Sequence, residues 1–292
     1  MRSRSRGSQP SRSAPAGARS ARSVSDGGGR AVGGRAGNGL GGEQVEGRHA
    51  VLEVLNARRR RVHEVLVAEG RDPSPVLDRI AQRCVELRVP LRRVSISRLA
   101  AAAATEAPQG VVARADPLEE SELSQLVLPA GGRVPLLVVA DRITDPHNLG
   151  SLIRSSAAAG VTGLVLPRHR AVHITPAVTK AAAGAVEHLR MAVVPGTAAA
   201  LSELSEAGVW TLGLDPAADV PVWELSFAAE PLAVVLGAEG KGLSQLVSRR
   251  CDARAGIPQP GGGASSLNVA VAAAVACFEI ARQRMVEHRA ES

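Results

Sequence analysis

The sequence has very few aromatic side chains: its 292 residues include no Tyr, two Phe and two Trp. Proteins that hold single-stranded nucleic acid by stacking bases on rows of aromatic rings need several such side chains. That mode of binding is therefore not expected. Cysteine is also scarce, because Cys84, Cys251 and Cys277 are far apart and odd in number. They indicate neither a disulfide framework nor a zinc site, so we expect a reducing, cytoplasmic location and no metal.

Long apolar runs are missing as well. The longest stretch without charged or polar interruption, residues 269–278, is too short to cross a bilayer, so no membrane partner is expected. The chain is nevertheless 45% hydrophobic, which is sufficient for a packed core. Its length allows one large domain or two smaller ones.

Positive charge is concentrated at the start of the chain. Residues 1–42 hold eight Arg and one acid, a net charge of +7, whereas residues 43–292 hold 27 basic and 27 acidic residues. Because residues 1–43 are rich in Arg, Ser and Gly and poor in large apolar residues, we expect a disordered basic tail. Three interpretations stay open: a dispensable solvated tail, an RNA-binding arm, or a transit peptide, which the many Gly disfavour.

Residues 44–116 are predicted to form a small α/β unit. The expected elements are a helix at 50–55, strands at 62–67, 89–94 and 109–113, and a helix that places Leu77, Ile80 and Ala81 on one face. Residues 43–116 carry 13 basic against 10 acidic residues, a net charge of +3. The run Arg58–Arg61 falls in a turn between helix and strand, where it could contact phosphates or simply be solvated.

Residues 117–133 have the composition of a linker, with a short helix that Asp116 would cap and Pro117 would begin. From residue 134 strands alternate with helices, which predicts a mostly parallel sheet covered on both faces. The expected strands are 136–140, 164–166, 191–194, 209–214, 232–236 and 255–257, and the expected helices are 149–159, 178–186, 198–206, one from 243 and 267–287. Ligands of such sheets bind at loops beyond the carboxyl ends of strands.

The first such loop spans residues 141–150. Asn148 is placed to cap the helix that follows. Arg154 is a cation early in an otherwise apolar helix, where it opposes the helix dipole. It therefore indicates either an anionic partner or a solvent-facing side chain.

Two more loops complete the set. Residues 237–242 lack the spacing of a P-loop or a dinucleotide fingerprint, and Glu239 would repel a pyrophosphate, so an uncharged or cationic ligand is favoured. Residues 257–268 combine a Pro turn and three Gly with Ser-Ser-x-Asn at the start of a helix. Each loop alone is weak support for a site.

Together the three loops closely resemble the signature motifs of the SpoU family of RNA 2′-O-ribose methyltransferases, in the SPOUT superfamily. The matching segments are residues 145–150 with Arg154, residues 236–240, Ile257-Pro258 and residues 266–269. The resemblance covers about residues 45–287. It is closest to the subgroup that methylates a guanosine of large-subunit ribosomal RNA and carries a front domain similar to ribosomal protein L30. Gly47, His49 and Gln109-Gly110 match that front domain, whereas residues 1–42 have no counterpart.

Some positions depart from the family pattern. Gln259 stands where Met is usual, and residues 261–263 form a loop that is one residue longer than usual. Ala270 and Pro108 replace a common Ser and His. The changes affect the expected rim of the cofactor site and none of the polar motif residues.

The resemblance implies an L30e-like RNA-binding domain at 44–116, a linker at 117–133, and a SPOUT domain at 134–292 with a C-terminal trefoil knot. It implies that S-adenosylmethionine lies against Gly237, Ile257 and Leu267. Arg154 would be the central catalytic residue, holding an RNA phosphate. The residues that orient it, the ribose and the cofactor would be Asn148, Glu239, Ser266 and Asn268.

The resemblance further implies a homodimer with ribosomal RNA as partner. Two alternatives stay open: a methyltransferase that acts on transfer RNA or confers antibiotic resistance, and a non-catalytic RNA-binding scaffold. The presence of all five polar motif residues argues against the scaffold.

Overall fold

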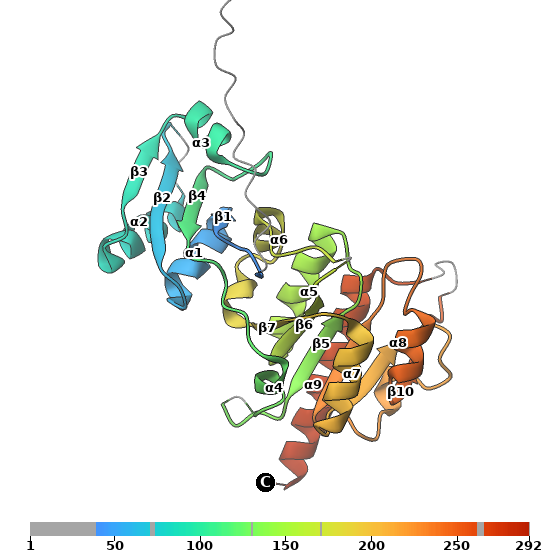
Figure 1. The fold of residues 1–292 in the computed structure, drawn as a ribbon. Helices are drawn as coiled ribbons and strands as arrows, with labels where there is room; N and C mark the ends of the chain where they lie inside the picture. Colours follow the sequence, from blue (N-terminus) through green and yellow to red (C-terminus); the bar gives the residue numbers. More distant parts are fainter. Residues whose placement is uncertain (1–38, 71–73, 130, 170, 262–265, 292) are drawn as a thin grey trace, which may run out of the picture. The chain divides into compact units, whose positions relative to one another are not determined.

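The computed structural model describes residues 39–70, 74–129, 131–169, 171–261 and 266–291 (Figure 1). Most of the predicted tail, residues 1–38, lies outside this description. Residues 39–43 do not fit the tail prediction. Leu40 is 1% exposed in the core of the large sheet domain, and the Gly41 carbonyl accepts a 2.9 Å hydrogen bond from the Leu118 amide. The Gly-rich composition gave no sign of this segment's burial, which rests on Leu40 together with backbone hydrogen bonds such as that from the Ile174 amide to the Leu40 carbonyl.

The first sheet has four strands in the order β1-β4-β2-β3, with β2 and β3 parallel and β4 antiparallel to both of its neighbours. Its elements are β1 (Gln44–Glu46), α1 (Arg48–Ala57), β2 (Val62–Ala68), α2 (Pro75–Leu87), β3 (Leu91–Val94), α3 (Ile96–Ala102) and β4 (Val111–Ala115). One core joins α1 and α2 to one sheet face, and a smaller one joins α3 to the other. The sequence reading missed β1 and α3.

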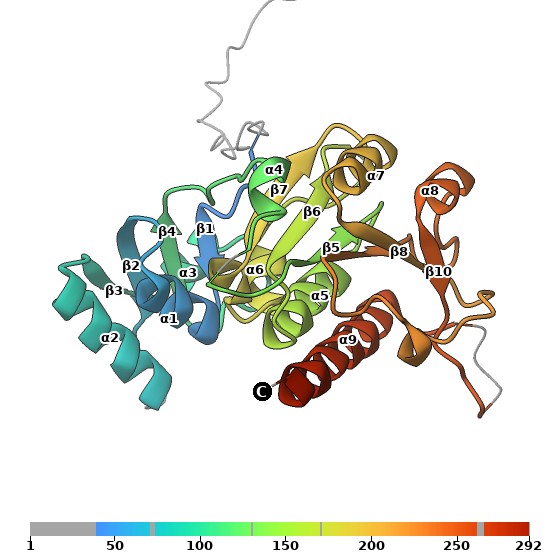
Figure 2. The same ribbon diagram turned by 90° about the horizontal axis from the view of Figure 1, so that it is seen from below.

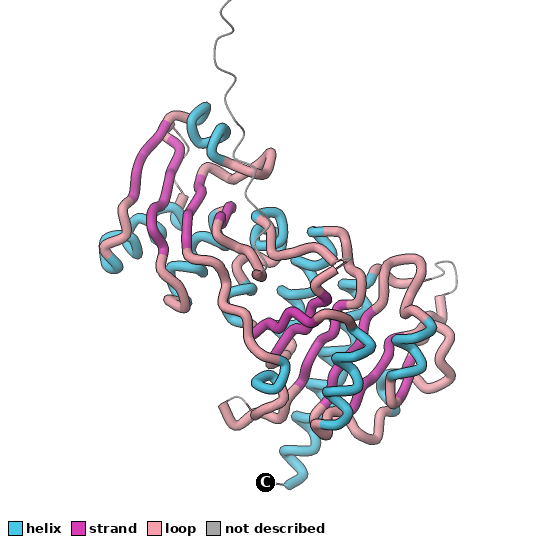
Figure 3. Tube along the Cα trace, viewed as in Figure 1, coloured by secondary structure: helices cyan, strands magenta, loops and turns pink. Residues whose placement is uncertain are grey.

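The second sheet has six strands, all parallel, in the order β10-β8-β9-β5-β6-β7. Figure 3 draws the strands in magenta and the helices in cyan. Its strands are β5 (Leu136–Ala140), β6 (Gly163–Pro167), β7 (Arg190–Val194), β8 (Trp210–Leu214), β9 (Leu232–Leu236) and β10 (Ala253–Ala255). The prediction of an α/β fold with a parallel sheet is confirmed. Every residue of β5, β6 and β9 is buried, as expected for strands covered on both faces.

Helices cover both faces of this sheet (Figure 2). They are α4 (Leu123–Leu126), α5 (Pro146–Ala158), α6 (Pro176–Ala181), α7 (Thr197–Glu206), α8 (Gln245–Arg250) and α9 (Val269–Glu291), with 3₁₀ turns at Ala185–His188 and Val222–Glu224. Alternate residues of β5 point to opposite faces. Leu136 and Val138 join the core beneath α5 and α9, whereas Leu137 and Val139 join the core beneath α4, α7 and α8.

The predicted linker helix starts later than expected. It begins at Leu123 and not at Pro117, because Glu122 and Gln125 form a reciprocal capping box. Asp116 caps nothing and instead accepts a 2.7 Å hydrogen bond from His63.

The arginine run joins the two sheet domains. Arg60 donates to both Glu187 oxygens, at 3.1 and 2.6 Å, and the two side chains are only 5% and 0% exposed. Arg59 donates to the Glu187 and Leu189 carbonyls. The Arg60 side chain is therefore buried and not solvated as expected, whereas Arg59 is exposed. No helix among the described residues could cross a membrane. No group of three or more His, Cys, Asp or Glu residues among them could hold a metal ion.

Candidate active site at the carboxyl ends of β5 and β9

The candidate site lies where the sheet reverses its direction of growth. From β5 the chain adds β6 and β7 on one side. It then crosses to the other side, where it forms β8 and afterwards β9, which lies between β8 and β5. In open parallel sheets, ligands bind beyond the carboxyl ends of strands at such a switch point. The loop after β5 and the loop after β9 are therefore neighbours, and both carry predicted site residues.

The start of α5 differs from the prediction in a way that matters for the site. Asp145, not Asn148, caps the helix: its Oδ1 accepts a 2.7 Å hydrogen bond from the Asn148 amide, and Pro146 occupies the first turn. Asp followed by Pro is a strong helix start. The Asn148 side chain is thus not used for capping and is available to the site.

Three predicted residues from the three motifs form one hydrogen-bonded cluster. Asn148 Nδ2 donates to Glu239 Oε2 at 2.9 Å. Asn268 Nδ2 donates to Asn148 Oδ1 at 2.8 Å and to Glu239 Oε1 at 3.3 Å. The Asn268 Oδ1 accepts from the Ala270 amide at 2.9 Å, which caps α9. The cluster fixes the orientation of a carboxylate at the mouth of the loop after β9.

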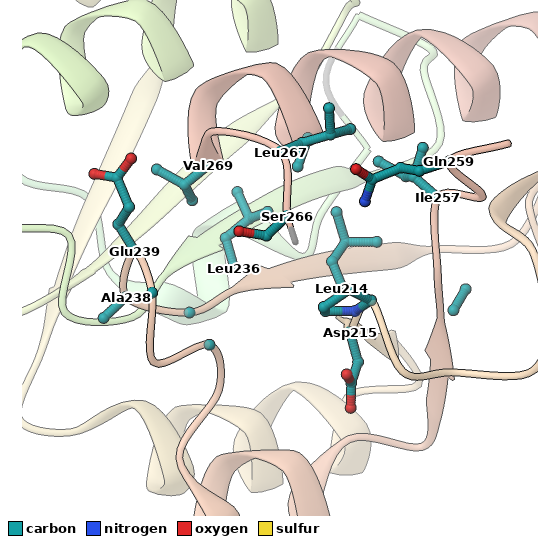
Figure 4. A pocket seen from close by; sticks show the side chains of 16 residues that line it. Leu214, Asp215, Leu236, Ala238, Glu239, Ile257, Gln259, Ser266, Leu267 and Val269 are labelled. Atoms are coloured by element: carbon teal, nitrogen blue, oxygen red, sulfur yellow. The ribbon is translucent and has the colours of Figure 1, made fainter. Parts of the chain in front are cut away.

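A cavity of about 310 Å³ adjoins this cluster (Figure 4). It is lined by Leu214, Asp215, Pro216, Leu236, Gly237, Ala238, Glu239, Gly240, Gly242, Ala255, Ile257, Gln259, Ser266, Leu267, Val269 and Ala272. Gly237 has no room for a side chain, since a Cβ there would lie 2.1 Å from the Gly242 carbonyl carbon. The loop 237–242 therefore folds tightly on itself and presents backbone to the cavity.

The charged residues that line the cavity indicate the class of ligand it suits. Its only ionisable residues are Glu239 and Asp215, and none of the lining residues is basic. Leu214, Leu236 and Ile257 provide apolar walls. The residues therefore suit a ligand that joins a positive charge to a flat ring able to lie between apolar walls. S-adenosylmethionine offers both, in its sulfonium and its adenine.

Most predicted site residues come together here. Glu239, Ser266, Gly237, Ile257 and Leu267 line the cavity, and the two asparagines hold Glu239. Arg154 is the exception. It is exposed on α5 and does not line the cavity, and its side chain makes no hydrogen bond or ion pair with another described residue.

The sequence reading missed the supporting residues. Asp215 follows β8 at the same edge of the sheet and accepts hydrogen bonds from Ala217 and Arg254. Its position directly after a predicted strand is the feature by which the sequence could have identified it. The buried Asp141 accepts from Thr197 at 2.6 Å and from Arg142 at 3.0 Å, and Arg142 reaches the Gly242 carbonyl at 3.5 Å. This network connects the end of β5 to the loop after β9.

None of the cysteines is suited to nucleophilic catalysis. Burial raises the pKa of Cys84 to about 11 and those of Cys251 and Cys277 to about 12. Their thiols therefore stay protonated at neutral pH.

Comparisons with known proteins agree with the geometry. Residues 135–278 match the model of the SpoU rRNA Methylase family, and residues 44–121 match the model "RNA 2′-O ribose methyltransferase substrate binding". A curated protein of Xylella fastidiosa, 23S rRNA (guanosine-2′-O-)-methyltransferase RlmB, is 39% identical over 243 residues, which cover 82% of this chain and 96% of the relative. A Bacillus subtilis protein, putative TrmH family tRNA/rRNA methyltransferase YacO, is 35% identical over 83% of this chain and 96% of its own length.

A solved structure extends the comparison to the fold. The SpoU methyltransferase AviRb of Streptomyces viridochromogenes, crystallised with AdoMet, superposes with a TM-score of 0.68 at 28% identity. The match covers 83% of this chain and 90% of AviRb. The resemblance inferred from the three motifs is confirmed, and this protein belongs to the SpoU rRNA methylase family.

Proposed function

We propose that this protein transfers a methyl group from S-adenosylmethionine to the ribose 2′-hydroxyl of a guanosine in 23S ribosomal RNA. The observation that carries the proposal is the convergence of Asn148, Glu239 and Asn268, from three separate motifs, beside a cavity whose only charges are negative. The names of the curated relatives support the substrate.

The cavity residues hold the cofactor in this proposal. The backbone of Gly237, Ile257 and Leu267 contacts it, and Glu239 and Asp215 complement its positive charge. When bound, S-adenosylmethionine supplies an electrophilic methyl group on a sulfonium centre.

Arg154 holds the RNA phosphate next to the target ribose. A guanidinium binds a phosphate through two parallel hydrogen bonds, and Arg154 has no competing partner among the described residues. An arginine does not act as a base, because it is never deprotonated in proteins. Its contribution is to align the hydroxyl and to place a phosphate oxygen where it can accept the proton. Asn148, Asn268 and Ser266 orient the ribose and Glu239.

Four finer features belong to the same proposal. Residues 44–116 form an L30e-like RNA-binding domain, which a linker at 117–133 joins to the catalytic domain at 134–292. The catalytic domain contains a trefoil knot, a proposal supported by the return of the chain from the edge strand β10 to pack α9 on α5 and β9. The protein works in the cytoplasm, a proposal supported by the absence of disulfides among the described residues.

The fourth feature is a homodimer formed through α9. This helix exposes Val271, Val275 and Phe278 at spacings of four and three residues, which places them on one stripe. A contiguous apolar stripe on a helix is a common protein interface.

The decisive experiment measures methyl transfer by the full chain with labelled S-adenosylmethionine. Separate 23S ribosomal RNA and transfer RNA samples serve as substrates, and the modified nucleotide is mapped. We expect label on a guanosine 2′-oxygen of 23S RNA. Label confined to transfer RNA would instead support the alternative that the Bacillus subtilis relative's name suggests, and no transfer to any RNA would favour the scaffold.

The Arg154→Ala variant tests the assigned mechanism. We expect turnover to fall by about 10²–10³-fold or more, the usual effect of removing a group that stabilises developing charge, while cofactor affinity is kept. Arg249→Ala, at an exposed arginine of α8, is the matched control and should retain activity. Near-normal turnover by Arg154→Ala would overturn the assignment.

A further inference from the structure

A second cavity, of about 480 Å³, lies in the first sheet domain at the amino ends of β2 and β3. Two short connections form its rim: residues 58–61, between α1 and β2, and residues 88–90, between α2 and β3. The lining residues are Val54, Leu55, Arg58, Arg60, Arg61, Val62, His63, Leu87, Arg88, Val89 and Pro90. Four arginines and a histidine thus surround an apolar floor, and none of the lining residues is acidic.

Three of these arginines have unoccupied guanidinium groups. Arg60 is committed to Glu187, and His63 is hydrogen-bonded to Asp116. Arg58, Arg61 and Arg88 are exposed, and their side chains make no hydrogen bond or ion pair with another described residue. They come from two loops that are about 30 residues apart in sequence, so the fold and not the local sequence gathers them.

Helix capping accounts for only part of this arrangement. Arg58 and Arg88 end α1 and α2 in the left-handed conformation, with φ of 52° and 55°. At this end of a helix the dipole is negative and stabilises a cation. Arg61 lies beyond the helix end, next to the first residue of β2. Besides the hydrogen bond from Arg83, the charge of Arg58 contributes to lowering the pKa of Glu86, which does not line the cavity. The lining itself therefore offers the three cations no acidic partner, and an anionic ligand would supply one.

We infer that this cavity binds the phosphate backbone of the RNA substrate, at a site separate from the methylated ribose. The inference rests on the proposed function, because it takes RNA as the substrate. Guanidinium groups bind phosphate oxygens in pairs, and the apolar floor formed by Leu55, Leu87 and Val89 suits the sugar face of a nucleotide. The cavity also lies within residues 44–121, the segment that matches a substrate-binding family model.

The ion pair Arg60–Glu187 gives the cavity a fixed relation to the catalytic domain. Arg60 lines the cavity, and its guanidinium also donates to the Gly42 and Asp116 carbonyls. RNA held on Arg58, Arg61 and Arg88 is therefore held relative to the second sheet. The role of these three residues is to bind the substrate, and they take no part in the methyl transfer itself.

The test compares two triple variants that remove the same charge from the same domain. The first is Arg58→Gln, Arg61→Gln and Arg88→Gln. The control is Arg79→Gln, Arg93→Gln and Arg98→Gln, at exposed arginines that do not line the cavity and have no side-chain partner among the described residues. The full chain is used, with the 23S ribosomal RNA fragment that the wild type methylates.

We expect the cavity variant to raise KM for RNA by about tenfold or more near physiological salt, with kcat and cofactor affinity unchanged. The slope of log affinity against log salt concentration should fall by about two to three, since each phosphate contact contributes about 0.7–0.9. The control variant should change both quantities much less. A third variant with Lys at the three cavity positions should keep most of the salt dependence.

Several outcomes would overturn the inference. Equal losses in the two triple variants would mean that RNA responds to diffuse charge and not to the cavity. A lower melting temperature with unchanged RNA affinity would leave helix capping as the sole role. A loss seen only with assembled ribosomal particles, and not with naked RNA, would make the occupant a protein. If the wild type methylates no 23S RNA, the proposed function fails instead, which the wild-type reaction reveals before any variant is compared.

Discussion

Asn268 performs two tasks with its two side-chain ends. Its Oδ1 caps α9 through the Ala270 and Val271 amides, and its Nδ2 donates to Asn148 and Glu239. One side chain therefore has both a structural role, as a helix cap, and a role in the site. Substitutions at this position can separate the two tasks.

The variant Asn268→Asp should fold normally and lose activity. An aspartate keeps the capping oxygen and suits the helix amino terminus, so the free energy of unfolding should change by less than about 1 kcal/mol. It cannot donate to Asn148, and it places a second carboxylate beside Glu239. We expect the single-turnover methylation rate to fall about 100-fold. Urea unfolding and rapid-quench assays on the same preparation measure the two effects.

Asn268→Ala provides the comparison, because it removes the cap as well and should cost about a further 1 kcal/mol of stability. If the Asp variant were as active as the wild type, the amide of Asn268 would have no part in the site.

At the residue scale, the sequence predicted site residues that stand in short motifs. It did not predict the residues that support the site from distant positions in the chain. The sequence predicted Asn148, Glu239 and Asn268 as site residues because each stands in a motif that resembles the SpoU family. It assigned Asn148 the wrong local role, since Asp145 competes better as a cap before Pro146. Arg142 could not be found, because its partner Gly242 is 100 residues away and only the sheet order brings the two together.

At the scale of elements, α9 combines a buried face with an exposed apolar stripe. Ala273 and Cys277 are fully buried, whereas Val271, Val275 and Phe278 are 48%, 39% and 49% exposed. This stripe supports the proposed homodimer. Nothing along the sequence separates the two faces, because the residues from 269 to 278 are all small or apolar.

The variant Phe278→Ser should dissociate that homodimer. Removing a buried Phe forfeits about 1.5–3 kcal/mol on each protomer, and a twofold contact counts the loss twice. The dimer Kd should therefore rise at least about 100-fold, which sedimentation velocity measures. Leu246→Ser, at an exposed apolar residue of α8, is the control and should leave the assembly unchanged. A wild-type chain that sediments as a monomer at tens of micromolar would refute the dimer.

Elements with strong local patterns were predicted, and elements that depend on distant pairing were not. The runs that form β5 and β9 were located to the residue. By contrast, β1 has three residues and exists because it pairs with β4, some 70 residues later. Leu40 was missed for the same reason, since its burial depends on contacts made by the folded second sheet domain.

At the scale of the whole molecule, the net charge and the proposed cofactor cavity belong to different parts of the chain. The +7 of the chain equals the charge of residues 1–42, whereas the cavity beside Glu239 has no basic lining residue. The cationic surface that the fold does organise is the cavity in the first sheet domain. The sequence indicated the domain order but not this arrangement, because the order of strands and the joining of domains arise from contacts distant in sequence.

The buried ion pair between Arg60 and Glu187 connects the two sheet domains, so a variant that breaks it should lower the stability of the protein. Glu187→Gln replaces the carboxylate beside the buried Arg60 guanidinium with a neutral amide, and breaking one side of a buried ion pair costs about 3–5 kcal/mol. We expect the free energy of unfolding in urea to fall by that amount. Proteolysis should also become faster in residues 117–133, which connect the domains. Glu86→Gln, which breaks the more exposed pair with Arg83, should change little.

A double variant separates the charge from the packing. Arg60→Met with Glu187→Leu removes both charges and keeps apolar volume, and such replacements of buried pairs are often neutral or stabilising. It should be more stable than Glu187→Gln, although the hydrogen bonds of Arg60 to Gly42 and Asp116 are lost. If the double variant keeps normal stability but loses RNA turnover with an unchanged cofactor affinity, the ion pair acts by orienting the first sheet domain toward the active site. If Glu187→Gln unfolds at the wild-type urea concentration, the two domains are held by other contacts, and the RNA cavity is not fixed relative to the active site by this pair.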